Sequence, residues 1–191
     1  NDEMYLVEGQ AIRAVEGYVV LRDTEMRWQI DTRKCSKGYI VEYKDIVHGL
    51  VRPERRNIGL FLSHEQNVFA SPDGVAIVRF KHDVINQFPI EWIFHTLRTE
   101  RCRLQFWTES GGTSYGKLTL EQIKNVLIPI PSQQEINKAK EKVEIWAKAV
   151  TASSQMFHEI WEKGDKVAIL NSPLIGLGST DIPMGDENDN D

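Results

Sequence analysis

The sequence has little that would support a redox, metal or membrane function. Its two cysteines, Cys35 and Cys102, are far apart and do not have the spacing of a metal site. We therefore expect two free thiols, buried or half-buried, in a reducing cytoplasm, where disulfides are rare. No apolar run approaches the roughly 20 residues that a helix needs to cross a bilayer, so the sequence predicts no membrane partner.

Motifs of common catalytic sites are also missing. The sequence contains no G-x-G-x-x-G, no P-loop, no G-x-S-x-G and no H-E-x-x-H. Its five histidines are scattered, and no two lie at ligand spacing on one helix face. We therefore expect no cofactor and no metal.

One loose pattern keeps a catalytic alternative open. Asp31, Glu42 and Lys44 have the order of a nuclease site, in which two carboxylates hold a divalent ion and a lysine polarises water. A half-exposed strand on which a glutamate and a lysine both face solvent explains the same residues more simply.

Charge is distributed unevenly along the chain. The net charge is −5, from 23 basic and 28 acidic residues. Residues 171–191 hold five of the acids and no base, so the rest of the chain is balanced at 23 of each. From Arg27 to Lys117 there are 14 basic and 10 acidic residues. This modest basic excess is compatible with phosphate contact, although a solvated mixed surface explains it as well.

Apolar periodicity predicts an α+β fold. Strands are expected in residues 17–22, 39–51 and 75–80, with a turn at SPDG (71–74), where Pro presets the first turn position. Helical spacing of apolar residues predicts one helix of about four turns from Ile90 to Leu104. Thr119 and Gln122 form a capping box for a short helix.

After that short helix, the sequence predicts an extended strand, then a long helix and then a tail. Residues 126–131, VLIPIP, are expected to form an extended edge strand, because proline cannot donate to a sheet ladder. Ser132 and Glu135 then form a second capping box, which opens a helix from about 133 to 163. Residues 165–191 are expected to be a flexible acidic tail.

The long helix has apolar residues at heptad spacing, which is typical of a coiled coil. A helix of about 30 residues is roughly 45 Å long, more than a small domain covers. Packing against the parent domain and packing against another long helix both remain open. The second alternative assigns the helix interface to Ile136, Val143, Trp146, Val150 and Phe157.

Two segments have the residue types that bind nucleic acid. Residues 111–117, GGTSYGK, combine glycine-freed amides with hydroxyls, an aromatic ring and a lysine, although a mobile surface loop would have the same composition. Residues 52–57, RPERRN, place three arginines in one turn, where Glu54 could also serve as an ordinary partner. The candidate contacts are Arg52, Arg55, Arg56, Thr113, Ser114, Tyr115 and Lys117, with Lys44 and His48 in second place.

Six short motifs, in order, resemble the DNA-specificity subunit of type I restriction–modification systems. They are Asp45-Ile46, Arg52-Pro53, Val78-Arg79, Gly112-Thr113, Ile128-Pro129-Ile130-Pro131 and Gln134-Glu135-Ile136. The similarity covers roughly residues 27–163. The sequence departs from the family pattern at Gln134-Glu135, where the usual order is Glu-Gln, and at Ser132, where the family has a second proline.

The resemblance implies a β-rich target recognition domain with short helices (1–131) and a long spacer or dimerisation helix (132–164), which the acidic tail (165–191) follows. It implies a non-catalytic module that recognises double-stranded DNA and directs a partner adenine methyltransferase, with a restriction subunit as a further partner in restricting systems. A half-subunit that forms a homodimer and a piece of a larger fused enzyme both fit this pattern. Two other classes remain open, the metal-dependent nuclease and an assembly module that does not bind DNA.

Overall fold

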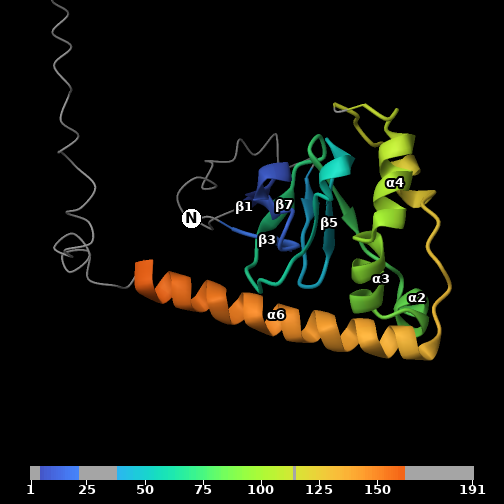
Figure 1. Cartoon of the computed structure of the whole chain (residues 1–191). Coiled ribbons are helices and arrows are strands. Elements are labelled where there is room, and N and C mark those ends of the chain that lie inside the picture. Colours follow the sequence, from blue (N-terminus) through green and yellow to red (C-terminus); the bar gives the residue numbers. More distant parts are fainter. Residues whose placement is uncertain (1–4, 22–37, 114, 162–191) are drawn as a thin grey trace, which may run out of the picture. The chain divides into compact units, whose positions relative to one another are not determined.

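The computed structural model describes residues 5–21, 38–113 and 115–161, with side chains up to residue 156. The chain divides into two compact units, residues 1–150 and 151–191. The first unit holds the described strands, and Figure 1 shows them beside a group of short helices. The boundary at residue 150 lies within the long helix α6 (Gln133–Trp161).

Two mixed β-sheets form the centre of the first unit. The smaller sheet has the order β1-β7-β4, in which β7 pairs parallel with β1 and antiparallel with β4. The larger has the order β2-β3-β6-β5-β8, in which only β3–β6 is parallel. The strands are β1 Tyr5–Val7, β2 Ile12–Arg13, β3 Tyr18–Val19, β4 Tyr39–Ile40, β5 Ile46–Gly49, β6 Ile58–Leu60, β7 Val68–Ala70 and β8 Val75–Val78.

Strand β5, which lies between β6 and β8, is covered on both faces. Ile46 belongs to an apolar cluster shared with the helices, and its neighbour Val47 belongs to a second cluster shared with the smaller sheet. Successive side chains of a strand point to opposite faces, so a strand between two layers needs apolar residues at consecutive positions. This explains why the sequence IV occurs here without polar alternation.

Short helices cover the other face of the larger sheet. Ile93, Leu97 and Phe106 are almost fully buried in the cluster that they share with β5, β6 and β8. The helices are α2 His82–Gln87, α3 Ile90–Leu97, α4 Glu100–Glu109 and α5 Leu120–Lys124, with the 3-10 turns η1 Gly9–Ala11 and η2 Pro53–Arg55. The expected strands around β3, β5 and β8 and the turn at 71–74 are present.

The single helix expected from Ile90 to Leu104 is wrong, because the chain breaks after Leu97. Thr99 is extended (φ −68°, ψ 159°) and is the N-cap residue of α4. Arg98, at the break, sends its guanidinium inward, where it donates to the carbonyls of Ile58 (2.5 Å) and Ala14 (2.9 Å). These contacts with distant segments outweigh the local helical periodicity, which continues through the break.

The expected edge strand at residues 126–131 is also wrong, since this segment pairs with no strand of the described residues. The side-chain amide of Gln105 replaces a strand partner: Leu127 N donates to Gln105 Oε1 (2.9 Å), and Gln105 Nε2 donates to Leu127 O (2.9 Å). Pro129 and Pro131 have no N–H to extend this pairing.

Both predicted capping boxes are confirmed. The Thr119 hydroxyl accepts from Gln122 N (3.3 Å), and Thr119 N donates to Gln122 Oε1 (2.8 Å). At α6, the Ser132 hydroxyl accepts from Glu135 N (3.3 Å), and Ser132 N donates to Glu135 Oε2 (2.7 Å). These contacts hold the pKa of Glu135 below its ordinary value, chiefly through the Ser132 backbone.

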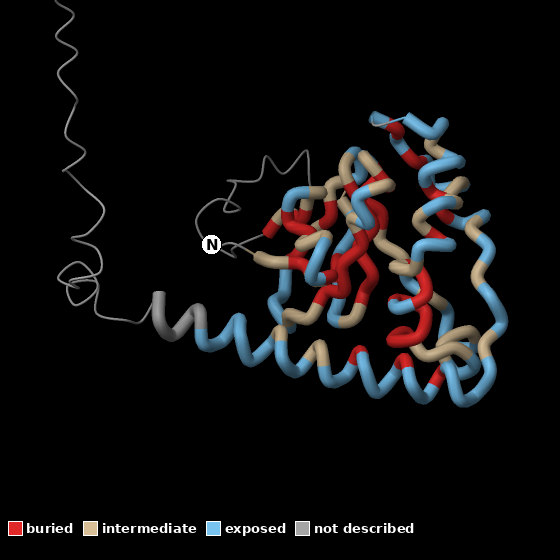
Figure 2. Tube along the Cα trace, in the orientation of Figure 1, coloured by how far each residue is buried: buried red, intermediate tan, exposed pale blue. Residues whose placement is uncertain are grey.

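The first half of α6 packs against its own domain. Ile136, Ala139 and Val143 are buried in the cluster that contains α3, and Figure 2 shows that the buried parts of α6 lie in its first half. Trp146 stacks on Phe94, with ring centroids 5.3 Å apart, and its Nε1–H donates to the Glu16 carbonyl (3.0 Å). This part of the helix is therefore a structural element of the β-rich domain.

Candidate nucleic-acid interface

The two segments with nucleic-acid-binding residue types lie side by side, although 60 positions separate Arg52 from Gly112. Val51 and Lys117 form an antiparallel β-bridge. Arg52 N donates to Gly116 O (3.1 Å), and Leu118 N donates to Leu50 O (2.8 Å). We call residues 52–57 the arginine turn and residues 111–117 the glycine loop. This backbone pairing makes them one surface.

The arginine turn has an uncommon backbone. Arg52 and Arg56, which flank η2, both have a left-handed conformation with φ of 55°. Non-glycine residues occupy this region at a cost of about 1–3 kcal/mol each, and such residues cluster at functional sites. Pro53, buried between them, fixes the start of the 3-10 turn. The turn is held in place by packing beside α4, as Figure 1 shows.

Glycines give the glycine loop its course. Gly111 and Gly112 have φ of 91° and 64°, so the chain can leave the end of α4 in a tight reversal. At Gly116 the reason is space, because a Cβ would lie 2.7 Å from the Ser110 carbonyl oxygen and clash with the Ser110 hydroxyl. The loop therefore approaches α4 closely where it pairs with Arg52.

Two arginines of the turn have different partners. The Arg52 guanidinium carbon lies over the Tyr115 ring, 4.6 Å from its centroid, and Tyr115 itself is 76% exposed. Arg56 instead forms an ion pair with Glu100 of α4. Glu100 also pairs with Arg103, whose Nε donates to it at 2.9 Å. Hydrogen bonds from Arg103 and then Arg56 lower the pKa of Glu100 to about 2.

The other candidates on this surface are exposed. Arg55, Thr113 and Lys117 are exposed, and within the described residues no ion pair engages Arg55 or Lys117. Ser114 lies outside the described residues. The surface thus presents cations, a hydroxyl and an aromatic face to solvent, which are the groups that contact phosphates and base edges.

His48 is not part of this surface. Its side chain is buried, packs edge-on against the Phe106 ring at 4.6 Å, and lies 2.8 Å from the Gly49 carbonyl through Nδ1. Burial lowers the pKa of His48 to about 4. The prediction that His48 contacts DNA is therefore wrong, because a buried side chain on an interior strand cannot reach a ligand.

Lys44 lies at the opposite end of β5 from the arginine turn. Its ammonium group pairs with the buried Glu91 of α3 at 2.6 Å. Burial opposes the charged lysine, but the hydrogen bond from Lys44 to Glu91 and its charge give a net rise in the pKa of Lys44. The four residues of β5 place about 13 Å or more between Lys44 and Arg52. The structure therefore does not bring Lys44 together with the other candidates.

Sequence reasoning missed the ion pair that supports the Lys44 turn. Arg79 donates to both carboxylate oxygens of the buried Asp45, at 2.8 and 2.6 Å, and to Glu42 at 3.1 Å. The Asp45 hydrogen bond is the main reason for the raised pKa of Arg79. Asp45 and Arg79 belong to two of the six motifs. Because they pair with each other here, both residues have a structural role.

The residues of the nuclease alternative have separate partners. Glu42 pairs with Arg79, and Lys44 pairs with Glu91. Asp31 lies outside the described residues, and within the described ranges no group of three or more His, Cys, Asp or Glu side chains could hold a metal. Cys102 is buried, as expected, and Cys35 lies outside the described residues.

The predicted helix-interface residues have different surroundings. Ile136 and Val143 are covered by their own domain, Trp146 is half-buried against Phe94, and Val150 is half-buried. The Phe157 side chain lies outside the described residues. A partner helix therefore could not contact Ile136 or Val143 and would have to contact exposed side chains of α6.

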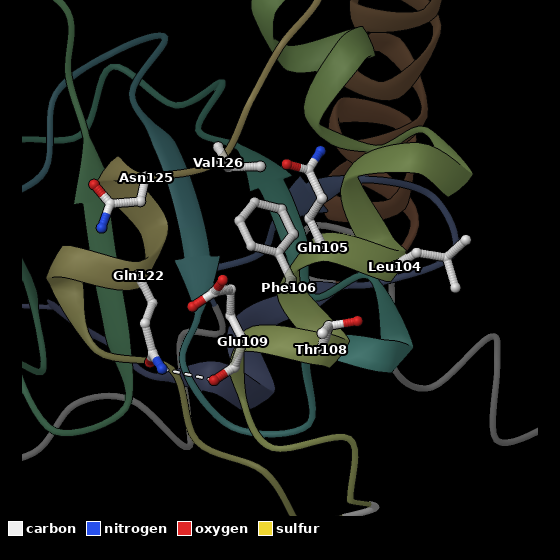
Figure 3. A pocket seen from close by; sticks show the side chains of 8 residues that line it. All are labelled: Leu104, Gln105, Phe106, Thr108, Glu109, Gln122, Asn125 and Val126. Atoms are coloured by element: carbon white, nitrogen blue, oxygen red, sulfur yellow. Dashed lines mark hydrogen bonds between the residues drawn. The ribbon is translucent and has the colours of Figure 1, made fainter.

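A shallow groove of about 260 Å³ lies between α4 and α5. Figure 3 shows Gln122 crossing one end of it, where Nε2 donates to the Glu109 carbonyl (2.6 Å). Its lining contains one carboxylate, Glu109, and none of the candidate residues. Among the helices of the described residues, none combines the length and the apolar character needed to span a bilayer.

Glu100 and Arg103 are the members of the surface that sequence reasoning missed. Their spacing of three on one helix predicts a pair. Nothing in the sequence connects them to Arg56, which is 44 positions away from Glu100.

Two solved structures have a fold similar to that of this chain. No protein-family model and no curated protein matches the sequence. A structure from work on complex assembly and conformational transition of the type I R-M system is similar, with TM-score 0.59 and 20% identity, over 97% of this chain and 46% of that chain. The HsdS subunit from Thermoanaerobacter tengcongensis is similar with TM-score 0.58 and 23% identity, over 85% of this chain and 40% of its own.

This chain thus spans less than half the length of either protein. The resemblance predicted from six motifs is confirmed at the level of the fold: the chain has the α+β fold of part of a type I restriction–modification specificity subunit.

Proposed function

We propose that this chain binds double-stranded DNA through the arginine turn and the glycine loop, and selects the target of a partner adenine methyltransferase. One observation carries the proposal: backbone pairing of Arg52 with Gly116 joins two segments, distant in sequence, into one exposed cationic surface. Such a surface can position phosphates through Arg55, Lys117 and Thr113 while other groups contact base edges.

The fold supports the same proposal. A specificity subunit needs a rigid support for its DNA-contacting loops, and both segments here extend from elements that contribute residues to the apolar core, β5 and α4. The proposal assigns methyl transfer to the partner and recognition to this chain. A restriction subunit would join the complex in a restricting system.

Salt dependence of duplex binding tests the DNA-binding part. We would measure affinity for a fluorescent 30-base-pair duplex of random sequence over a range of salt concentrations. Each lost phosphate contact makes the slope of log K against log salt less negative by about 0.9. We therefore expect a change of about 2 for the double variant Arg55→Ala, Lys117→Ala.

The matched control removes two cations elsewhere. Lys124 and Lys140 are exposed, on α5 and α6, and pair with neighbouring glutamates. Their double alanine variant should keep the wild-type slope. Equal slopes for wild type and both variants would instead favour the assembly module that does not bind DNA.

The methyltransferase partner needs its own test. The full chain would be mixed with a methyltransferase subunit encoded beside it, and methyl transfer from S-adenosylmethionine to duplex adenine measured. We expect transfer that depends on the chain and is lost in the Arg55→Ala, Lys117→Ala variant. Transfer by the partner alone at the same sites would contradict the proposal.

We also propose that two copies pair through α6, because this helix has apolar side chains that its own domain leaves uncovered. Ile145 is 61% exposed and Val150 is half-buried, so they offer apolar surface where Ile136 and Val143 do not. Sedimentation should show a dimer that Ile145→Glu dissociates. A wild-type chain that stays monomeric at micromolar concentration would refute this pairing.

A further inference from the structure

The arginine turn contains cations in two chemically different states. Arg56 is neutralised by Glu100, which also pairs with Arg103. Arg52 has no carboxylate partner within the described residues, and its guanidinium lies on an aromatic face instead. A duplex must displace Glu100 to use Arg56, whereas Arg52 is available without breaking an ion pair.

The stacking geometry leaves the N–H groups at the edge of the Arg52 guanidinium free. A guanidinium over a ring uses its flat face, and its N–H groups point outward in the plane. Those in-plane groups form the paired hydrogen bonds to guanine O6 and N7 in the major groove. Tyr115 is 76% exposed, so the pair is at the surface and not in the core.

The base of the Arg52 side chain is fixed as well. Its backbone is left-handed, and its N–H donates to Gly116 O, one residue after the tyrosine on which it stacks. The same short backbone ladder therefore positions both members of the pair. A side chain that is oriented before binding loses less conformational entropy on binding, which favours a role that needs accurate geometry.

We propose that Arg52 is the specificity-determining residue of this surface, that it recognises a guanine in the major groove, and that Tyr115 is its positioning residue. Arg56 and Arg103 then bind phosphate, where an anion replaces Glu100. This inference rests on the proposed DNA-binding function, and it assigns separate roles to arginines that the sequence could only group together.

Selection from a duplex library with a randomised core tests this assignment. The wild-type chain should enrich a motif that contains a guanine. Arg52→Lys keeps the charge but loses the planar fork, so it should lose the preference at that base pair, by about 5- to 150-fold. Its affinity for the unselected library should change far less.

Three further variants distinguish the positioning role of Tyr115 from the effect of a positive charge. Tyr115→Ala should weaken the preference at the same base pair, and Tyr115→Phe, which keeps the ring, should restore it. Arg56→Ala is the matched control, because it should lower affinity for all sequences while the enriched motif stays the same. Circular dichroism and thermal melts of each variant confirm that it is folded.

The outcomes distinguish this inference from the proposed function. If Arg52→Lys kept the full wild-type motif, Arg52 would not determine specificity. Salt-dependent binding without any enriched motif would also refute the inference, but it would leave duplex binding intact. A wild-type chain that binds no duplex at low salt would overturn both.

Discussion

The burial of His48 in β5 predicts how the stability of the fold depends on pH. Burial lowers the pKa of His48 to about 4, against 6.5 for an ordinary histidine, because a charge in the apolar space beside Phe106 would be unsolvated. Below pH 6.5 the unfolded chain takes up a proton that the folded chain does not. His48 therefore contributes stability above pH 6.5, and that contribution is lost as the pH falls toward 4.

The size of the effect follows from linkage. A difference of about 2.5 in pKa corresponds to about 3 kcal/mol once the pH lies below both pKa values. Between pH 7.5 and pH 5 the same relation gives a loss of about 2 kcal/mol. For a chain of this size, that loss lowers the Tm by about 4–8 °C.

Urea unfolding at a series of pH values measures this loss. His48→Phe keeps an aromatic ring against Phe106 and removes the titrating group, so its stability should depend less on pH between 7.5 and 5, even if it is lower throughout. Exposed His64, changed to Gln, controls for the removal of a histidine as such. If His48→Phe kept the wild-type pH dependence, the folded state would have to hold His48 in a solvated or charged form, contrary to the structure.

Three further changes test other parts of the structure. Glu100→Gln should raise affinity for random duplex and make the salt slope more negative by about 1–2, since it releases two paired cations; an unchanged slope would mean that they do not reach phosphate. Gly116→Ala should cost about 1–3 kcal/mol in urea unfolding, because its Cβ has no space beside Ser110. Trp146→Ala should cost about 2–3 kcal/mol through the lost stack on Phe94, and a loss below about 0.5 kcal/mol would contradict the packing of α6.

Local patterns in the sequence predicted local structure well. The capping boxes of α5 and α6 and the turn at 71–74 were all predictable, because each depends on hydrogen bonds between residues three or four positions apart. The arginine turn and the glycine loop were also identifiable as chemical groups. The order of six motifs was sufficient to predict the fold.

Local patterns failed where a distant segment competed. The helix predicted from Ile90 to Leu104 is broken at Arg98, whose side chain bonds carbonyls 40 and 84 positions away. The edge strand at 126–131 did not form because Gln105, 22 positions earlier, occupies the backbone groups of Leu127. In the sequence, His48 lies four positions from both Lys44 and Arg52. In the folded protein its side chain packs against Phe106.

The sequence by itself determined which segments carry cations, hydroxyls and apolar stripes, since composition and short-range hydrogen bonding are local properties. Tertiary structure decided which of these segments meet. It placed Arg52 on Tyr115, neutralised Arg56 with Glu100 and covered Ile136 and Val143. The physical reason is that long-range contacts depend on how the whole chain closes on itself, and no spacing along the sequence encodes that closure.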